Sequence, residues 1–362
     1  MTQESTQGAA QSPLGRHGAK RLPSVLVTSY NIELKDKKGF VGDRASKGAF
    51  REIIDGLRKS LRRNGDDPIG DEPTDELTKS ELDRLLTSGD AEAAGLLHTA
   101  VEDFSRELAS IIRRFQKQTE WSRVERIAVG GGMQASRLGK LVAGRTSVML
   151  RTEKQSVELV SIHNDPDEAG LIGAVHLAPQ WIFKSFDGII GVDIGGTNIR
   201  AGVIDLNLKR APNLAKAKVW KLSSWRYGDE EGVKRIDAVE YLAKMIRALI
   251  STVEKKRKGM KLAPFIGVGC PGLIEEDGSI SRGTQNLPGN WETKRFNLPL
   301  ALRDLVPEIQ GSKPSIMLHN DAVVQGLSEI PYMQDVKGWA ILTIGTGLGN
   351  ATFVNGPDAD SK

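Results

Sequence analysis

Two stretches decide the fold, IGVDIGGTNIRAGVIDL (190–206) and ILTIGTGLG (341–349), since each joins apolar strands through a glycine-rich turn. Paired glycines allow a tight turn and let backbone amides approach an anion closely. A carboxylate at a strand end suits Mg²⁺ held through water. One such turn is also typical of a plain glycine hairpin, but the second copy favours two loops gripping one polyphosphate. The expected phosphate or metal contacts are Asp193, Gly195, Gly196, Thr197, Asn198, Gly345, Thr346, Gly347 and Gly349.

The pattern around these loops predicts an α/β protein. Strands are expected at 189–194, 198–206, 217–223, 264–269, 315–320, 339–344 and 350–354, with helices at 236–256, 298–306 and 322–329. Three consecutive strands followed by alternating helices and strands are typical of a ribonuclease-H-like layer. No G-x-x-x-x-G-K-[ST] motif occurs in the chain, so a P-loop is excluded.

The composition is ordinary for a soluble globular protein. The chain has 362 residues, 39% apolar and 27% charged, with a net charge of +4 from 50 basic and 46 acidic residues. This balance argues only weakly for nucleic acid, and the basic runs at 58–63 and 255–258 are interpreted as solvated helix faces. A single cysteine excludes an intramolecular disulfide, and no apolar run is long enough to span a bilayer. We therefore expect a cytoplasmic protein with no membrane or nucleic-acid partner.

The first half of the chain has its own pattern. Residues 1–21 are small and polar, which predicts a disordered leader, and 22–34 is β-branched and predicts a strand. Helices are expected near 45–63 and 77–87. A longer one starts after Asp90, a good N-cap, with apolar residues recurring at spacings of three and four: Leu97, Val101, Phe104, Leu108, Ile111 and Phe115. A strand at 126–130, a helix at 135–143, a strand at 156–162 and a helix at 168–178 follow.

Several motifs resemble the ROK family of sugar kinases and repressors, within the superfamily of actin, heat-shock chaperones and hexokinases. They are VDIGGTNIRAGVID (192–205), GVGCPGLIEEDGSI (267–280), NLPGNW (286–291), LHNDAVVQGLSE (318–329) and TIGTGLG (343–349). They stand in the family's usual order and cover most of residues 188–356. The resemblance implies ATP as phosphate donor, Mg²⁺ as metal and a small sugar as acceptor.

The resemblance also implies a general base, Asp321. A carboxylate there can accept a hydroxyl proton as the oxygen attacks a phosphoryl group. Local sequence alone would make Asp321 a helix N-cap. The sugar contacts implied by the family are Asn320, Asn286, Gly269, Pro271 and Gly272. His319 is expected to be structural, and Cys270 a small buried residue.

One segment lies out of the family's order. Residues 126–180, with IAVGGGMQASRLGKL and AGLIGA, resemble the C-terminal end of ROK kinases, yet precede the first loop. Without them the half beginning at Gly345, with only 13 residues beyond Gly349, would lack its helices and adenine wall. We therefore expect two ribonuclease-H-like domains with an interdomain cleft, circularly permuted: 22–180 and 338–362 form the larger domain and 188–330 the smaller. Gly130, Gly131, Gly132 and Met133 would face the adenine.

The expected function is an ATP-dependent hexose kinase, with glucose as the default sugar. The Glu-x-Gly-His motif typical of ROK kinases is missing, and His17 is not assigned to it, so an N-acylhexosamine kinase stays open. The cysteine-rich zinc motif is missing too, so no structural zinc is expected. A non-catalytic sugar-sensing regulator would need a helix-turn-helix ahead of the sensor, and 1–44 predicts none. A catalytically dead scaffold is disfavoured by Asp321 and both loops. A homodimer is an option by analogy only.

Overall fold

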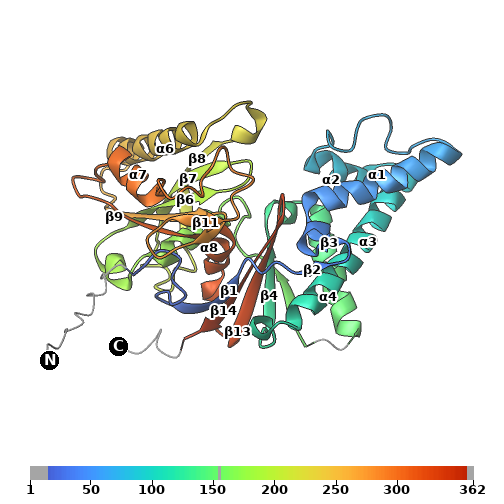
Figure 1. Ribbon diagram of the computed structural model, residues 1–362, viewed down its shortest axis with the longest axis horizontal. Helices are drawn as coiled ribbons and strands as arrows, with labels where there is room; N and C mark the ends of the chain where they lie inside the picture. Colours follow the sequence, from blue (N-terminus) through green and yellow to red (C-terminus); the bar gives the residue numbers. More distant parts are fainter. Residues whose placement is uncertain (1–14, 154–155, 357–362) are drawn as a thin grey trace, which may run out of the picture.

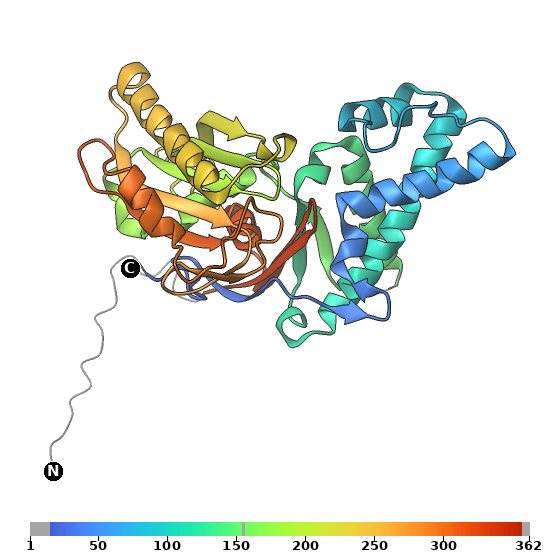
Figure 2. The ribbon, with the colours of Figure 1, turned by 45° about the horizontal axis from the view of Figure 1, so that its top comes forward.

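The computed structural model describes residues 15–153 and 156–356, which form two five-stranded sheets with helices between and outside them (Figure 1). The first sheet has the strand order β12-β9-β6-β7-β8, and the second has the order β1-β14-β13-β4-β5. Figure 2 shows the two sheets in separate halves of the molecule, with the long helices on the outer sides. The predicted α/β class is confirmed.

The strands of the two sheets are β1 (Val25–Tyr30), β4 (Arg126–Gly130), β5 (Glu158–Ser161), β6 (Gly188–Ile194), β7 (Ile199–Asp205), β8 (Lys218–Trp225), β9 (Leu262–Cys270), β12 (Ser315–Asn320), β13 (Gly338–Ile344) and β14 (Leu348–Asn355). Two short hairpins pair β2 (Lys35–Asp36) with β3 (Gly39–Phe40), and β10 (Leu273–Ile274) with β11 (Ile280–Arg282). The α-helices are α1 (Lys47–Asn64), α2 (Lys79–Ser88), α3 (Ala91–Gln116), α4 (Arg137–Thr152), α5 (Ala169–Ala174), α6 (Arg235–Lys256), α7 (Leu298–Leu305) and α8 (Asp321–Leu327).

The first sheet comes from one continuous stretch of chain. Strands β6, β7 and β8 form an antiparallel meander, and β9 and β12 then add in parallel on the other side of β6. Parallel neighbours need a crossover, and α6 and α7 supply it. Apolar residues of these helices pack on the sheet in one cluster that includes Val192, Leu242 and Trp291.

The second sheet is assembled from both halves of the chain. Strand β13 pairs antiparallel with β14, β14 pairs antiparallel with β1, and β4 and β5 add in parallel on the other side of β13. Val25 pairs with Asn355, so the first and last strands of the chain are neighbours in this sheet. Residues 126–161 therefore share a sheet with the second glycine loop.

Helices α5 and α8 lie between the two sheets. Their apolar residues, with Phe265 from the first sheet and Ile341 and Phe353 from the second, form one buried cluster. The two helices pack closely, since a Cβ on Gly173 would lie 1.7 Å from the carbonyl oxygen of Val324. Although α5 belongs to the segment assigned to the larger domain, it contacts β6 and β9 of the first sheet as well.

Helices α1 to α4 cover the outer face of the second sheet. The apolar face predicted for the long helix is buried there, with Phe104, Leu108 and Ile111 fully inside. Asp90 accepts hydrogen bonds from the amides of Glu92 and Ala93, so the predicted N-cap is confirmed. The predicted end of α4 at 143 is wrong, because Val142, Thr146 and Leu150 continue its buried face to Thr152.

The predicted leader is wrong for residues 15–21; residues 1–14 lie outside the described part. The amide of Gly18 donates to the carbonyl of Leu318 at 3.0 Å, and the amide of Leu318 donates to Nδ1 of His17 at 3.1 Å. A Cβ on Gly18, which has φ +57°, would lie 2.2 Å from the carbonyl oxygen of Ile274. This segment lies along β12, so the chain passes the first sheet before it enters the second sheet at β1.

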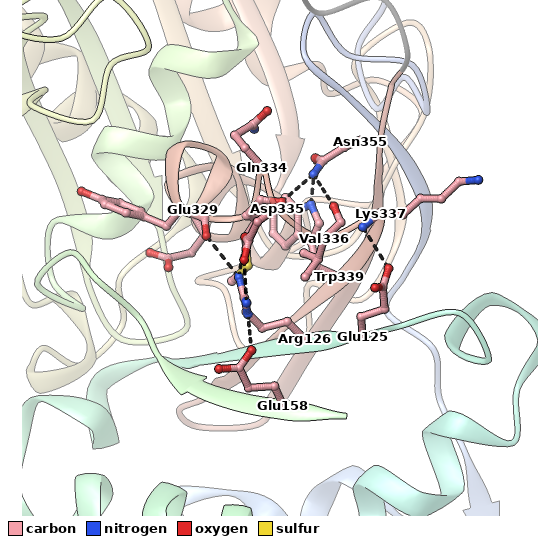
Figure 3. A network of polar contacts seen from close by, with 12 residues as sticks. Glu125, Arg126, Glu158, Glu329, Gln334, Asp335, Val336, Lys337, Trp339 and Asn355 are labelled. Atoms are coloured by element: carbon pink, nitrogen blue, oxygen red, sulfur yellow. Dashed lines mark hydrogen bonds and ion pairs between the residues drawn. The ribbon is translucent and has the colours of Figure 1, made fainter. Parts of the chain in front are cut away.

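An ion-pair network ties the segment after α8 to the start of β4 (Figure 3). Arg126 donates to Glu158 on β5 and to Asp335, at 2.6 Å and 2.7 Å. The Asn355 side chain donates to carbonyls of Met333 and Val336. The connection from the first sheet to the second is thereby held by β4, β5 and β14 together. No helix within 15–153 and 156–356 is long and apolar enough to cross a membrane.

Candidate active site

Asp321 lies at the junction of β12 and α8. The helix N-cap is Asn320, whose Oδ1 accepts hydrogen bonds from the amides of Ala322 and Val323. The capping interpretation of Asp321 is therefore wrong. Asn320 Nδ2 donates to Asp321 Oδ1 at 3.0 Å. Burial, followed by the negative charge of Asp193, raises the pKa of Asp321 to about 7.

Asp193 is the next-to-last residue of β6, beside the first glycine loop. It contacts Arg200 at 3.4 Å, and Arg200 also pairs with Asp167 at 2.7 Å. Burial raises the pKa of Asp193, while Arg200 opposes the rise. In the described ranges no three His, Cys, Asp or Glu side chains are grouped to hold a metal alone. A single carboxylate still fits Mg²⁺, which usually takes one or two carboxylates plus phosphate oxygens and water.

The two glycine loops face each other. A Cβ on Gly196 would lie 3.2 Å from Asn286 Cβ and 3.8 Å from Thr346 Oγ1. The first loop, the NLPGNW segment and the second loop therefore meet within a few bond lengths. Gly349 lies on the other side of the second loop, where its Cβ would be 3.1 Å from the Cβ of Ala322, next to Asp321. Four segments distant in the chain thus converge.

The predicted sugar loop lies against the same helix. A Cβ on Gly269 would lie 3.6 Å from the Cα of Asp321. Gly272 has φ +108° and its carbonyl accepts a hydrogen bond from Asn320 Nδ2 at 3.1 Å. Pro271 lies between them. The structure brings this loop and the Asn320–Asp321 pair together.

The glycines at the end of β4 lie beside the second loop. Gly131 has φ +85°, and a Cβ there would lie 2.5 Å from both the amide nitrogen and the carbonyl oxygen of Ile344, the residue before Gly345. Gly132 follows, and its carbonyl accepts a hydrogen bond from Lys79 Nζ at 2.9 Å. Gly130 lies next to Gln325, and Met133 is buried.

Lysines near the loops were not singled out from the sequence. Lys47 begins α1, and its amide donates to the carbonyl of Gly345 at 2.8 Å. Its pKa is lowered by burial and then by the charges of Arg51, Lys79 and Arg226. These cations come from both halves of the molecule. Like charges gathered beside two glycine loops indicate a polyanion site.

Tyr227 is a second residue that sequence reasoning missed. Its hydroxyl donates to the carbonyl of Gly195 at 2.6 Å and lies 3.3 Å from the carbonyl of Asn286. Burial raises its pKa, so it stays protonated and can donate. It therefore clamps the first loop to the NLPGNW segment. No sequence signal marked it, because the pairing is set by packing.

His319 and Cys270 are structural, as expected. His319 is buried, its Nε2 lies 3.2 Å from the carbonyl of Ala19, and burial lowers its pKa to about 4. It stays neutral at pH 7 and holds the N-terminal segment. The Cys270 thiol is fully buried in β9, and burial followed by Asp321 and Asp193 raises its pKa. The burial of the Cys270 thiol and its raised pKa exclude a nucleophilic thiolate at this position.

Part of the chain is similar to known proteins. Residues 189–358 match the model of the ROK family. They are a ROK-family segment. A glucokinase from Thermotoga maritima is 29% identical over 171 residues, 46% of this chain and 45% of that protein. This chain thus spans about half the length of that relative.

Two solved structures were also found. A sugar-kinase candidate from Cytophaga hutchinsonii is 20% identical, with a TM-score of 0.35, over 47% of this chain and 48% of that one. An N-acetylmannosamine kinase candidate from Listeria monocytogenes is 23% identical, with a TM-score of 0.30, over the same shares. The predicted resemblance to the ROK family is confirmed by the family model and the glucokinase relative.

Proposed function

We propose that this protein is an ATP-dependent hexose kinase with Asp321 as its general base. The observation that carries the proposal is the meeting of Asp321 with two opposed glycine loops. Its carboxylate has a pKa of about 7, which is well matched to taking a hydroxyl proton near neutral pH. The glucokinase relative supports a sugar as acceptor, and glucose is the first to test.

The reaction follows from the arrangement. Asp321 accepts the proton of a sugar hydroxyl while its oxygen forms a bond to the terminal phosphorus of ATP. The bond from that phosphorus to the bridging oxygen breaks, and ADP leaves. Asn320 orients the Asp321 carboxylate through its 3.0 Å hydrogen bond and can also contact the sugar, together with Asn286 and the loop from Gly269 to Gly272. Positioning and electrostatics supply most of the acceleration in such transfers.

The phosphates are proposed to lie between the loops. The amides of Gly195, Gly196, Gly345 and Gly347 would donate to phosphate oxygens, with Lys47 and Lys79 adding charge. When bound, Mg²⁺ would be held at Asp193 and would neutralise charge on the phosphates. The adenine would lie near Gly130–Gly132 and Met133, because this segment lies against the second loop.

We also propose that the chain is a circularly permuted arrangement of two ribonuclease-H-like domains. Strand order and direction support it. In both sheets one strand leads into a glycine loop. On one side of it, two strands are added through antiparallel pairs, and on the other side two strands are added through parallel pairs. In the second sheet, strands β1, β4 and β5 come before β13 and β14 in the chain, although β13 and β14 correspond to the first two strands of the other sheet.

A coupled assay of ADP release over a panel of sugars tests the proposal. Glucose, mannose and N-acylated hexosamines would be compared at fixed ATP and Mg²⁺. We expect turnover with a hexose that requires Asp321. If no sugar causes release of ADP, yet calorimetry shows that a sugar binds, a non-catalytic sugar-sensing regulator becomes the better interpretation.

A further inference from the structure

The end of β1 brings a side chain to the candidate sugar site that no motif marks. Tyr30 pairs with Ala351 on β14, and the amide of Asn31 donates to the carbonyl of Asn350 at 3.0 Å. Strand β14 begins directly after the second glycine loop. Asn31 therefore leaves the second sheet at the end that faces Asp321.

The Asn31 carboxamide shares an acceptor with Asn320. Its Nδ2 lies 3.5 Å from the carbonyl oxygen of Gly272, which also accepts the 3.1 Å hydrogen bond from Asn320 Nδ2. The same Asn320 group lies 3.0 Å from Asp321 Oδ1. A distance of 3.5 Å is long for a hydrogen bond. Such a contact is easily exchanged for a shorter one to a ligand, and Oδ1 of Asn31 has no hydrogen bond within the described residues.

The backbone holds this side chain in place. Asn31 has φ +51°, a left-handed conformation that asparagine tolerates better than most residues. Asn350, which is 2% exposed, fixes the next residue: its Oδ1 accepts from the amide of Ile32 at 3.0 Å, and its Nδ2 donates to the carbonyl of Ile32 at 3.1 Å. The backbone at Asn31 is thus preorganised, while its carboxamide can exchange the long contact to Gly272 for a ligand.

We propose that Asn31 is a sugar-binding residue that hydrogen-bonds to the hydroxyl next to the reacting one. A carboxamide offers a donor and an acceptor together, which suits a sugar hydroxyl that is both. In this arrangement Asn320 and Asp321 contact the reacting hydroxyl, and the Asn31 side chain approaches from the opposite sheet across Gly272. The substrate class is therefore a ring with a free vicinal hydroxyl pair. This inference rests on the proposed kinase function.

The experiment uses Asn31→Gly, which removes the carboxamide and keeps a left-handed backbone accessible. Kinetics would be measured on the preferred sugar and on its deoxy analogues, one for each hydroxyl. For the variant we expect the KM for sugar to rise about 5- to 10-fold, the loss of one neutral hydrogen bond, with the KM for ATP unchanged. Wild-type protein should discriminate against one deoxy analogue by a similar factor, and Asn31→Gly should lose that discrimination.

A matched control is Asn207→Gly. Asn207 has φ +48° and lies at the turn after β7, where its Nδ2 contacts the carbonyl of Lys216. We expect its kinetics to equal the wild type. If Asn31→Gly keeps the wild-type KM and still rejects the same deoxy sugar, the inference is overturned while the kinase proposal stands. If the wild type neither binds nor phosphorylates any sugar, the kinase proposal fails and takes this inference with it.

Discussion

The two sheets have the same plan but different origins in the chain. The strand that leads into the glycine loop can be counted as the first strand of each sheet. The spatial order third, second, first, fourth, fifth is then β8, β7, β6, β9, β12 in the first sheet and β1, β14, β13, β4, β5 in the second. The directions agree as well, with antiparallel pairs on one side and parallel pairs on the other. Only the chain order differs. Strand pairing and core burial thus follow spatial neighbours and not sequence position.

The same tripeptide lies at the end of the fifth strand of one sheet and just after it in the other. His319 and Asn320 are the last residues of β12 and Asp321 comes next, whereas His163, Asn164 and Asp165 follow the end of β5 after one intervening residue. In the first set His319 and Asn320 are buried and Asp321 is partly buried. In the second set His163 pairs with the buried Glu329 at 2.6 Å, and Asp165 is exposed. Identical residues therefore have different surroundings, because only one set lies between the glycine loops.

The largest expected effect separates these two aspartates. Asp321→Asn should lower turnover by at least about 10²-fold, because it removes the proton acceptor. Asp165→Asn, the matched control at the equivalent place, should stay close to wild type. Initial rates of ADP release at saturating sugar and ATP would measure both. Near-normal turnover in the Asp321 variant would show that another group is the base.

The next effect tests the positive charge gathered beside the two loops. Lys47→Ala should raise the KM for ATP about 10-fold, the expected loss of one charge-assisted hydrogen bond. The KM for sugar should change little. Lys59→Ala, an exposed lysine farther along the same helix, is the control. Equal KM values for ATP in the two variants would show that Lys47 does not bind the phosphates.

A pH profile sharpens the comparison further. With a pKa raised to about 7, Asp321 is mostly protonated below pH 7, so kcat/KM for sugar should fall about tenfold per unit well below that value. The folded protein binds this proton more tightly than the unfolded chain, whose aspartate has an ordinary pKa. The contribution of this group to stability should therefore decrease as pH rises towards 7. A flat profile between pH 5.5 and pH 8 would contradict the assignment.

The smallest effect is expected from restoring the usual strand order. A gene encoding 188–362, a short linker and then 15–187 should give a protein of similar melting temperature and turnover. The reason is that Val25 already pairs with Asn355 and that loop closure costs little more as a loop lengthens. A variant opened inside β4, between Ala128 and Val129, is the control and should not fold. Failure of the first variant alone would argue against the permutation.

Sequence patterns predicted most strands and helices, because apolar periodicity and glycine turns are local signals. Strand β4 begins and ends where the pattern places it, and the face of α3 is buried as expected. The middle position of α5 was not predictable, since its residues are apolar all round and contact both sheets. Residues 15–21 were misassigned, because their small polar composition hides their hydrogen bonds to β12.

By itself, the sequence pointed to the residues that we propose carry the chemistry: two glycine loops, Asn320 and Asp321 at the end of a strand, and a loop at Gly269–Gly272. These are local patterns of residue type and spacing. Only the tertiary structure decided that Asn320 rather than Asp321 caps α8, and that burial raises the pKa of Asp321. It also brought Tyr227, Lys47 and Asn31 to the site. Their roles depend on contacts between segments distant in the chain, which no local pattern encodes.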